Sequence, residues 1–588
     1  MIPFHQKNSN IMDNKNLILA ITLSVGILLL WSILFEAPPI EDPNANPQLP
    51  EVSNKIDDEN ISTDFNSFDV GEAAIVSPDG IVSLNESLQN SKRISIKTPS
   101  LSGSINLLGL KIDDLVLKKY NQTLESDSEK IRFLSPGDTR DGLEISFGWI
   151  KPKDANFNVP DSKSVWSIKG KSTILDENNE IELEWSNQSG QVFKTFISVD
   201  KDYLFSVRQV VINNSSKEII VNNNSKVIRK KAPTLSGMFI LHEGPIGVLQ
   251  EELELIDYDD LKEDKKVLNF ESDNGWIGIT DKYWLAALIP NQNIPFKSIY
   301  AYDENLGYVA YFRSLESYNI KPNTKIEIDS KVFAGAKEAD LLDLYQEKFN
   351  IYNFDLAIDW GWFYFITKPL FYAISYFYEL FGNFGIAIII LTVITRIVFF
   401  PLANWSFVSM AKMKLLQPEM TRIKDLYKDD RQQQQQALMA LYKKEKVNPV
   451  SGCLPILIQI PFFFAIYKML FISIEMRHAP FYGWIEDLSV KDPTTIFNLF
   501  GLIPWDPPSF MIIGIWPILM GLTMYLQQKL NPAPPDPIQA KIFAFFPLFI
   551  TILLSQFAAG LVIYWTTNNV LSILQQWIIT RRTKIKTN

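Results

Sequence analysis

The stretch FGIAIIILTVITRIVFFPLA fills residues 384–403 and decides what kind of protein this is. As an α-helix its 20 residues extend about 30 Å, which is the thickness of the hydrocarbon core of a bilayer. It contains a single charge, on Arg396, which stands seven residues before Ala403 and so about 10 Å along a helix from the end of the run. The stretch therefore predicts a membrane span with one cation, and placing that charge within the bilayer costs free energy.

Charge divides the chain of 588 residues into two unlike parts. Residues 37–355 hold 34 Lys and Arg against 51 Asp and Glu, a net charge of −17, whereas residues 356–588 hold 20 against 13, a net charge of +7. The acidic part argues against nucleic-acid binding, because phosphate contacts need clustered Lys and Arg. The single cysteine, Cys453, rules out an intrachain disulfide, and with only three histidines it leaves no ordinary zinc site.

A second apolar run lies near the beginning of the chain. Leu17–Phe35 is uncharged over 19 residues, follows Lys15, and is not followed by a small-x-small cleavage pattern before Glu36. We expect a cytoplasmic segment at 1–16 and a retained signal anchor at 17–35, with a cleaved signal peptide as the alternative. Residues 36–69, rich in Pro, acids and amides, should form a solvated linker outside.

Basic residues fix the direction of the later spans. Residues 404–452 contain nine Lys and Arg and should lie inside. The aromatic segment 351–383 is therefore better explained as a helix lying in the outer interface than as another crossing. Beyond the span at 384–403, the same rule gives an outward span at 453–472, an outer loop at 473–508, an inward span at 509–528, an inner loop at 529–541, short spans at 542–557 and 560–579, and an inner basic tail at 580–588. The prediction is six spans with both ends inside.

Between residues 70 and 350 the pattern changes to short alternating runs. Ile181–Trp185 and Gln191–Phe196 alternate apolar with polar residues, and clusters of Asn, Asp, Gly and Ser separate such runs. Alternation of this kind predicts strands with one buried face, and many of them predict a large antiparallel sandwich. We expect a helix at about 337–349 to close it.

Polar side chains gather at the depth of Arg396. Gln459 stands six residues into its span and therefore level with Arg396, and Thr392 lies one turn deeper on the same helical face. The last span adds a polar group made of Thr566, Thr567, Asn568, Asn569 and Ser572. Together they predict a polar indentation that opens on the inner side only. The alternatives are that Arg396 extends to the inner interface and that the other side chains only join helices.

Several motifs of the second half resemble the YidC, Oxa and Alb insertases, strongly over residues 333–580 and more weakly in the acidic part. The motifs are Asn448–Pro455 with Gln459–Pro461 and Ala465–Tyr467, Thr392–Arg396 with Pro401–Leu402, Met410–Met413, Leu416–Pro418, Ala437–Lys446, Gly560–Tyr564, Ile358–Trp362, Gly275–Ile277 and Tyr283–Leu285. Ala336 departs from the pattern, because Gly-Pro-Lys is usual there.

The resemblance implies a bacterial inner-membrane protein insertase, which inserts and helps to fold inner-membrane proteins, alone or with the Sec translocon. It implies a five-span core with a hydrophilic groove open to cytoplasm and lipid, a cytoplasmic helical hairpin, and a periplasmic β-supersandwich before the core. The expected partners are nascent membrane proteins, the Sec translocon, the ribosome, the signal-recognition machinery and lipid, with no cofactor, metal or specific nucleic acid. The groove residues expected in this chain are Arg396, Thr392, Gln459, Tyr564, Trp565 and Asn568; Trp565 stands where many members have a second Tyr.

Two other functions remain as alternatives. The soluble fold resembles sugar mutarotases, but such an enzyme needs an acid and a base in one pocket, and His242–Glu243 is the only histidine pair of that part. A lone pair of this kind is usually structural. A small-solute transporter would show inverted repeats, and none is found in the sequence.

Overall fold

The computed structural model describes residues 81–588 except 126, 171, 235–240, 264, 362, 429, 448–453, 506, 509–510, 532–536 and 588. The expected cytoplasmic segment at 1–16, the signal anchor at 17–35 and the linker at 36–69 lie outside the described residues, as does most of the motif at 448–455.

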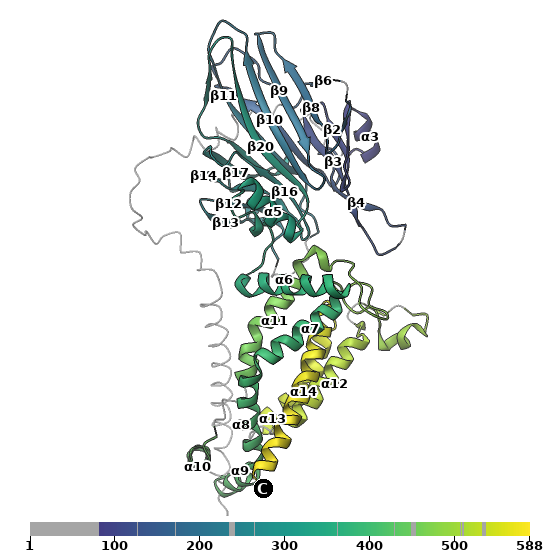
Figure 1. The fold of residues 1–588 in the computed structure, drawn as a ribbon, viewed down its shortest axis with the longest axis vertical. Coiled ribbons are helices and arrows are strands. Elements are labelled where there is room, and N and C mark those ends of the chain that lie inside the picture. The colour runs from purple at the N-terminus through teal and green to yellow at the C-terminus, as the bar shows by residue number, and fades with distance from the viewer. Residues whose placement is uncertain are drawn as a thin grey trace, which may run out of the picture. The chain divides into compact units, whose positions relative to one another are not determined.

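Two large sheets form the first half of the described chain (Figure 1). One has 11 strands in the order β14 (Leu268–Ser272), β17 (Phe296–Asp303), β18 (Gly307–Ser314), β11 (Ile219–Arg229), β5 (Leu143–Ile150), β3 (Lys111–Asn121), β2 (Leu101–Asn106), β1 (Arg93–Lys97) and β7 (Ile174–Leu175), with β19 (Tyr318–Ile320) on β11 and β4 (Lys130–Leu134) on β3. The other has 9 strands in the order β13 (Glu252–Leu255), β12 (Gly244–Leu249), β15 (Trp276–Thr280), β16 (Trp284–Ile289), β20 (Thr324–Ala336), β10 (Leu204–Asn213), β9 (Gln191–Val199), β8 (Glu180–Ser186) and β6 (Ser167–Lys169). Strand β7 runs parallel to β1, and the long central pairs are antiparallel.

Alternating side chains explain why these strands form. In β9 every second residue from Gln191 to Val199 is buried, and its partners β8 and β10 bury residues on the same face. The predicted strands at 181–185 and 191–196 are confirmed as parts of β8 and β9. The buried faces supply large aromatic residues such as Phe193, Phe205 and Trp276 to one core, so the expected all-β architecture is confirmed.

Short helices complete this part of the chain. They are α3 (Leu84–Gln89), α4 (Tyr258–Glu263), α5 (Ala339–Phe349) and the 3-10 turn η1 (Phe354–Ala357). The closing helix expected at 337–349 is α5, which buries Leu341, Leu342 and Tyr345 against the β core. It ends at Asn350, whose backbone is left-handed with φ 50°; Asn tolerates that conformation better than most residues.

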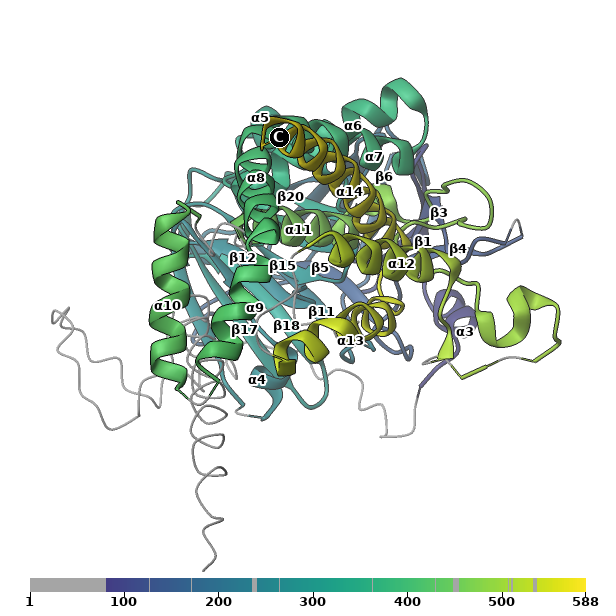
Figure 2. The ribbon, with the colours of Figure 1, turned by 90° about the horizontal axis from the view of Figure 1, so that it is seen from below.

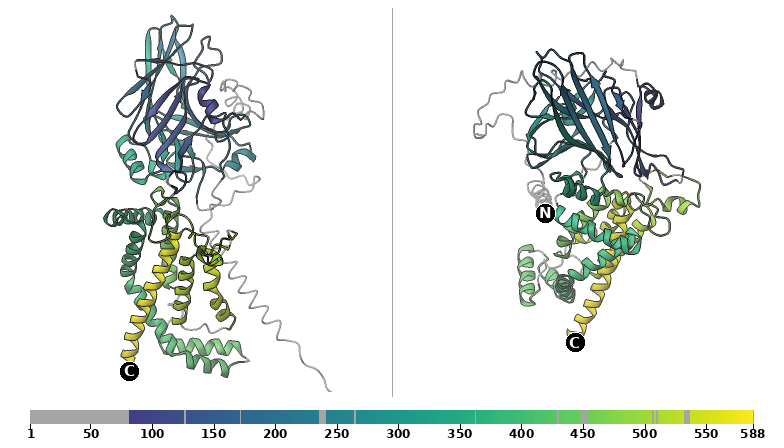
Figure 3. Two further views of the ribbon diagram at one scale, coloured as in Figure 1. Left: turned by 90° about the vertical axis from the view of Figure 1, so that its right-hand side faces the viewer. Right: turned by 45° about the horizontal axis from the view of Figure 1, so that its top comes forward.

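The second half is helical. Its elements are α6 (Tyr364–Phe381), α7 (Phe384–Val398), α8 (Phe400–Leu415), α9 (Gln417–Leu426), α10 (Arg431–Lys444), α11 (Leu454–Ile472), η3 (Ile474–Met476), η4 (Ile496–Gly501), α12 (Ile515–Leu530), α13 (Pro537–Leu554) and α14 (Ala559–Thr587). Helix α14 packs against α7, α8 and α12 (Figure 2). Helices α9 and α10 lie side by side, as Figures 2 and 3 show, and Pro418 stands in the first turn of α9.

The run at 384–403 is not one straight helix. Helix α7 ends at Val398, and α8 leaves it at an angle of 68°. Pro401 accounts for the break, because proline has no N–H to donate to the carbonyl four residues earlier, and it fits the first turn of a new helix. The span expected at 384–403 therefore covers α7 and the first turn of α8, which begins at Phe400.

Three other boundaries differ from the expectation. The span expected to begin at 509 becomes helical only at Ile515, and two hydrogen bonds join the residues just before that helix to the loop: the Ile496 N–H donates to the carbonyl of Ile513 and the Thr495 hydroxyl to that of Met511. Helix α13 starts at Pro537 and ends at Leu554, earlier than the expected 542–557. Helix α14 runs on through the tail expected from 580. A break does separate α13 from α14, but it lies at residues 555–558, because α14 already begins at Ala559.

By length and composition, the bent pair α7 and α8 is the one candidate for a membrane crossing among the described residues, and no single helix there meets the same test.

Candidate functional site

Arg396 lies in the last turn of α7 and reaches across to α14. Its Nε donates to the side-chain oxygen of Asn568 at 2.7 Å, and one terminal nitrogen donates to the Asn568 carbonyl at 3.3 Å. The same nitrogen donates to Oε1 of Gln459 on α11 at 3.3 Å. Three helices that are far apart in the sequence thus meet at one guanidinium, as expected for Arg396 and Gln459 from their equal depth.

Tyr564 belongs to the same cluster. Its side chain is buried in α14, and its hydroxyl lies near Gln459. Gln459 therefore lies between Arg396 and Tyr564.

The other two expected residues lie differently. Thr392 is fully buried, and its hydroxyl donates to the carbonyl of Ile388 at 2.7 Å, which uses its only hydroxyl proton within α7. Trp565 packs edge-on against Phe463 with ring centroids 4.8 Å apart and against the cluster that contains Met520. In these contacts Thr392 bonds within its own helix, and Trp565 packs against an aromatic ring of α11.

Helix α14 carries more polar groups than the expected set. Gln575 donates to the backbone carbonyl of Arg396 at 3.4 Å, and Gln576 donates to Asn531 at the end of α12 at 2.9 Å. Asn569 donates to Thr523 on α12 at 3.2 Å. The spacing could have revealed Gln575, because it stands seven residues after Asn568 and therefore on the same face of the helix.

Two basic residues of the helical part, Lys468 and Arg396, have different kinds of partner. Lys468 on α11 donates to a carboxylate oxygen of Asp359 at 2.6 Å, so its charge is balanced. Within the described chain no carboxylate pairs with Arg396, whose partners are neutral amides and a carbonyl. The guanidinium is thus held in place without being neutralised.

In the described residues of the β part, the His242–Glu243 pair makes structural contacts. His242 is buried, and its Nε2 lies 2.9 Å from the carbonyl of Pro245 three residues later. Burial lowers the pKa of the imidazole, so it is neutral at pH 7. The Glu243 carboxylate accepts from the backbone N–H of Lys282 at 3.2 Å. These contacts fit the structural role expected for the His242–Glu243 pair.

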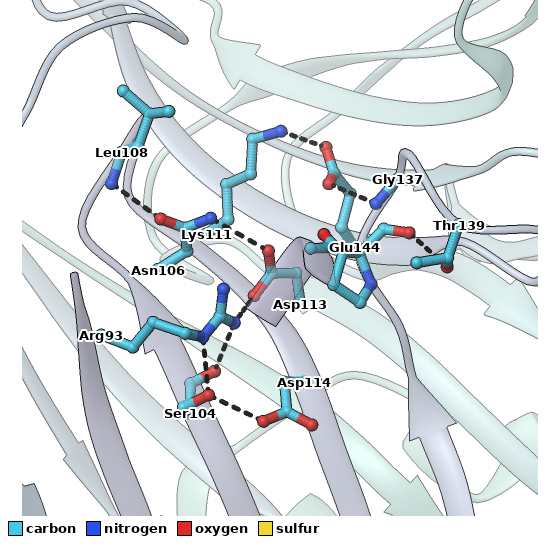
Figure 4. A network of polar contacts seen from close by, with 12 residues as sticks. Arg93, Ser104, Asn106, Leu108, Lys111, Asp113, Asp114, Gly137, Thr139 and Glu144 are labelled. Atoms are coloured by element: carbon cyan, nitrogen blue, oxygen red, sulfur yellow. Dashed lines mark hydrogen bonds and ion pairs between the residues drawn. The ribbon is translucent and has the colours of Figure 1, made fainter. Parts of the chain in front are cut away.

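Buried carboxylates in the first sheet are also paired (Figure 4). Lys111 donates to Glu144 at 2.8 Å, the Gly137 N–H reaches the other oxygen of that carboxylate at 3.1 Å, and Arg93 forms an ion pair with Asp113. Burial raises the pKa of Asp113 to about 6 despite its partner. The network joins neighbouring strands and so stabilises the sheet.

Comparisons with known proteins agree along the whole chain. The family model described as 60Kd inner membrane protein matches residues 376–587, and the YidC periplasmic domain model matches residues 93–373. A membrane protein insertase YidC of Pelagibacter ubique is 47% identical over 98% of this chain and 100% of its own length, and one of Rickettsia conorii is 46% identical with the same coverage.

A solved structure of an active YidC insertase covers 88% of this chain and 98% of its own, at 17% identity and a TM-score of 0.35. The assignment rests on the sequence relatives. With relatives of this similarity over nearly its full length, the chain belongs to the YidC family of membrane protein insertases.

Proposed function

We propose that the chain inserts and helps to fold inner-membrane proteins, alone or with the Sec translocon, through a hydrophilic groove in which Arg396 supplies the positive charge. Relatives named as insertases over their whole length support the activity, and the family models support an inner-membrane location. The observation that carries the role of Arg396 is that amides hold its guanidinium, with no carboxylate partner in the described residues.

Neutral partners suit a transient binding site. A carboxylate on the flank of an incoming chain brings a full opposite charge and can accept two parallel bonds from the guanidinium, so it can displace Gln459 or Asn568 from Arg396. Low dielectric around the site strengthens the attraction relative to bulk water. The apolar segment then moves into lipid, and burial of its surface drives release without nucleotide or metal.

The proposed topology has six spans. The segment at 17–35 is the first, α7 the second, and α11, α12, α13 and α14 are the rest, with both chain ends in the cytoplasm and the β part in the periplasm. The basic residues Lys412, Lys414, Lys529, Lys541 and Arg581 support this orientation, because they belong to the segments placed inside.

Helices α9 and α10 form the proposed cytoplasmic hairpin. Its exposed basic residues, such as Arg422, suit contact with the ribosome and the signal-recognition machinery. The run Gln432–Gln436 offers no apolar stripe to pack, which fits a surface-exposed pair of helices.

The test is insertion of a substrate with an acidic flank by cells depleted of the native protein and supplied with variants. Arg396→Ala should lose most insertion, whereas Arg396→Lys should keep much more, since it preserves the charge. Arg581→Ala, which removes an exposed cation at the end of α14, is the matched control and should insert normally. Equal losses for the Ala and Lys variants would show that shape, and not charge, is what Arg396 provides.

A further inference from the structure

The loop between α11 and α12 exposes an unusual amount of apolar surface. Residues 493–505 carry no charge. We call residues 496–505 the apolar loop. Its exposed apolar side chains are Ile496 39%, Phe497 39%, Leu499 52%, Phe500 51%, Leu502 83%, Ile503 43% and Trp505 46%.

The base of the apolar loop is rigidly held. Asp492 is buried and accepts hydrogen bonds from the Thr494 hydroxyl at 2.7 Å and from the backbone N–H of Trp516 at 3.0 Å. The Thr494 hydroxyl in turn accepts from the N–H of Ile515 at 3.0 Å. The loop is therefore fixed to the N-terminal end of α12.

That end of α12 lies beside the turn between α13 and α14. The Ala559 N–H donates to the carbonyl of Val490 at 2.7 Å, and Lys491 donates to Gln556 at 3.3 Å. The basic residues Lys529 and Lys541 lie toward the other ends of α12 and α13. The apolar loop thus leaves the helical part at the end opposite these basic residues.

Two residues of the apolar loop have a strained backbone. Leu499 and Phe500 both have left-handed backbones, with φ of 49° and 58°, which costs energy for residues other than glycine. The exposed apolar residues follow one another without a helical or strand period. They are therefore not confined to one face of the loop. A protein partner covers one face, whereas a fluid apolar solvent can contact all sides at once.

Several backbone N–H groups of the apolar loop have hydrogen-bond acceptors within the protein. The N–H of Phe500 donates to the carbonyl of Thr495 at 2.9 Å, and the N–H of Ile503 to that of Asn498 at 3.0 Å. The N–H groups of Ile496, Leu502 and Trp505 also find backbone acceptors. Unpaired N–H groups make an irregular loop costly in lipid, and these five N–H groups are paired.

We propose that the apolar loop inserts into the outer leaflet of the bilayer, with Leu499, Phe500 and Leu502 among the upper acyl chains and Trp505 at the headgroups. Tryptophan is enriched at that level of membranes, and short apolar segments lie in the interface without crossing it. The loop then anchors the outer ends of α12, α13 and α14 to the lipid beside the helices.

The experiment uses full-length protein in vesicles of phosphatidylethanolamine and phosphatidylglycerol. In a Cys453→Ser background, Leu502→Cys and Phe500→Cys carry an environment-sensitive fluorophore. Ser189→Cys, in an exposed turn between β8 and β9, is the matched control for water, and Phe545→Cys, 67% exposed on α13, is the control for lipid. Quenching is measured with aqueous iodide and with phospholipids that carry a nitroxide high or low on the acyl chain.

The expected result is several-fold less iodide quenching at 500 and 502 than at 189, with stronger quenching by the high nitroxide than by the low one. Iodide quenching equal to that at 189, with no effect of either nitroxide, would overturn the proposal. Protection from iodide and from both nitroxides would also overturn it, because another protein or a second copy would then cover the loop. Equal quenching by both nitroxides would overturn the interfacial placement.

Discussion

Arg229 shows how a single buried ion pair supports the β part of the chain. The residue is 8% exposed on β11, and one of its nitrogens donates to Oδ2 of Asp281 at 2.8 Å. Another nitrogen donates to the Tyr258 hydroxyl at 3.3 Å. The pair therefore connects the end of β11 to the turn after β15 and to α4.

Asp281→Asn should destabilise the protein by about 3–5 kcal/mol, because it leaves the Arg229 charge buried without a counterion. The measurement is thermal unfolding of the full-length protein in detergent, followed by the circular dichroism of the strands. Glu327→Gln is the control: it breaks the more exposed pair with Arg208, and such surface pairs contribute only about 0–1 kcal/mol. Similar melting temperatures for the two variants would contradict the prediction.

Glu475 makes stability depend on pH. One of its oxygens accepts from the N–H of Ala339 at 3.1 Å, and the other has no partner in the described residues. Burial raises the pKa of this carboxyl from 4.5 to about 7, and the nearby Glu338 and Asp340 act in the same direction. The folded state therefore keeps a proton that the unfolded state releases near its ordinary pKa.

That proton stabilises the folded state fully below about pH 4.5. The stabilisation is lost as the pH rises through about 7. Glu475→Gln should remove this loss, so the melting temperature of the variant should fall less than that of the unchanged protein between these pH values. Melting curves at a series of pH values check it, and parallel curves for the two proteins would show that Glu475 does not titrate in this range.

Among the elements, α13 is short for a membrane span. Its 18 residues extend about 27 Å, against a hydrocarbon core of roughly 30 Å. The turn after Leu554 has no Lys or Arg to extend to the interface, so we expect the bilayer to be thinner around this helix. A thinner bilayer shortens the path over which a polar flank is carried.

Four apolar residues inserted after Leu554 should therefore slow insertion while expression and folding stay normal. This position extends the outer end and keeps Thr551 in register with Gly521, which it closely approaches. Insertion rates into vesicles are the measurement. Full activity of a correctly folded variant would refute thinning and leave the role of Arg396 untouched.

Element types followed from local patterns, whereas their ends depended on distant contacts. Alternation predicted β8 and β9, and depth along a helix predicted the meeting of Arg396 with Gln459. The late start of α12 could not be predicted, since hydrogen bonds from Thr495 and Ile496 join the residues before it to the loop. The contacts of Thr392 and Trp565 depended on hydroxyl direction and ring packing, which residue spacing does not fix.

For the whole molecule, the proposed function requires that water reach Arg396 from the cytoplasmic side only. Arg396→Cys in a Cys453→Ser background should react with a membrane-impermeant thiol reagent applied to inside-out vesicles. The same reagent applied to the outside of intact spheroplasts should not react. No labelling from the cytoplasmic side would show that the polar cluster is closed, and labelling from both sides would indicate a pore.

The 68° bend between α7 and α8 also affects how a pulling force passes from one helix to the other. Helix α8 rests on α14 through Ala403, Phe407 and Met410, which pack with Ile579, and it continues into α9. A helix transmits force along its axis, but a bend turns an axial pull into a torque at the joint. The joint at Phe399 is three residues from Arg396, whose carbonyl is held by Gln575. We therefore expect tension on the hairpin to act beside the guanidinium, with α14 as the fixed support.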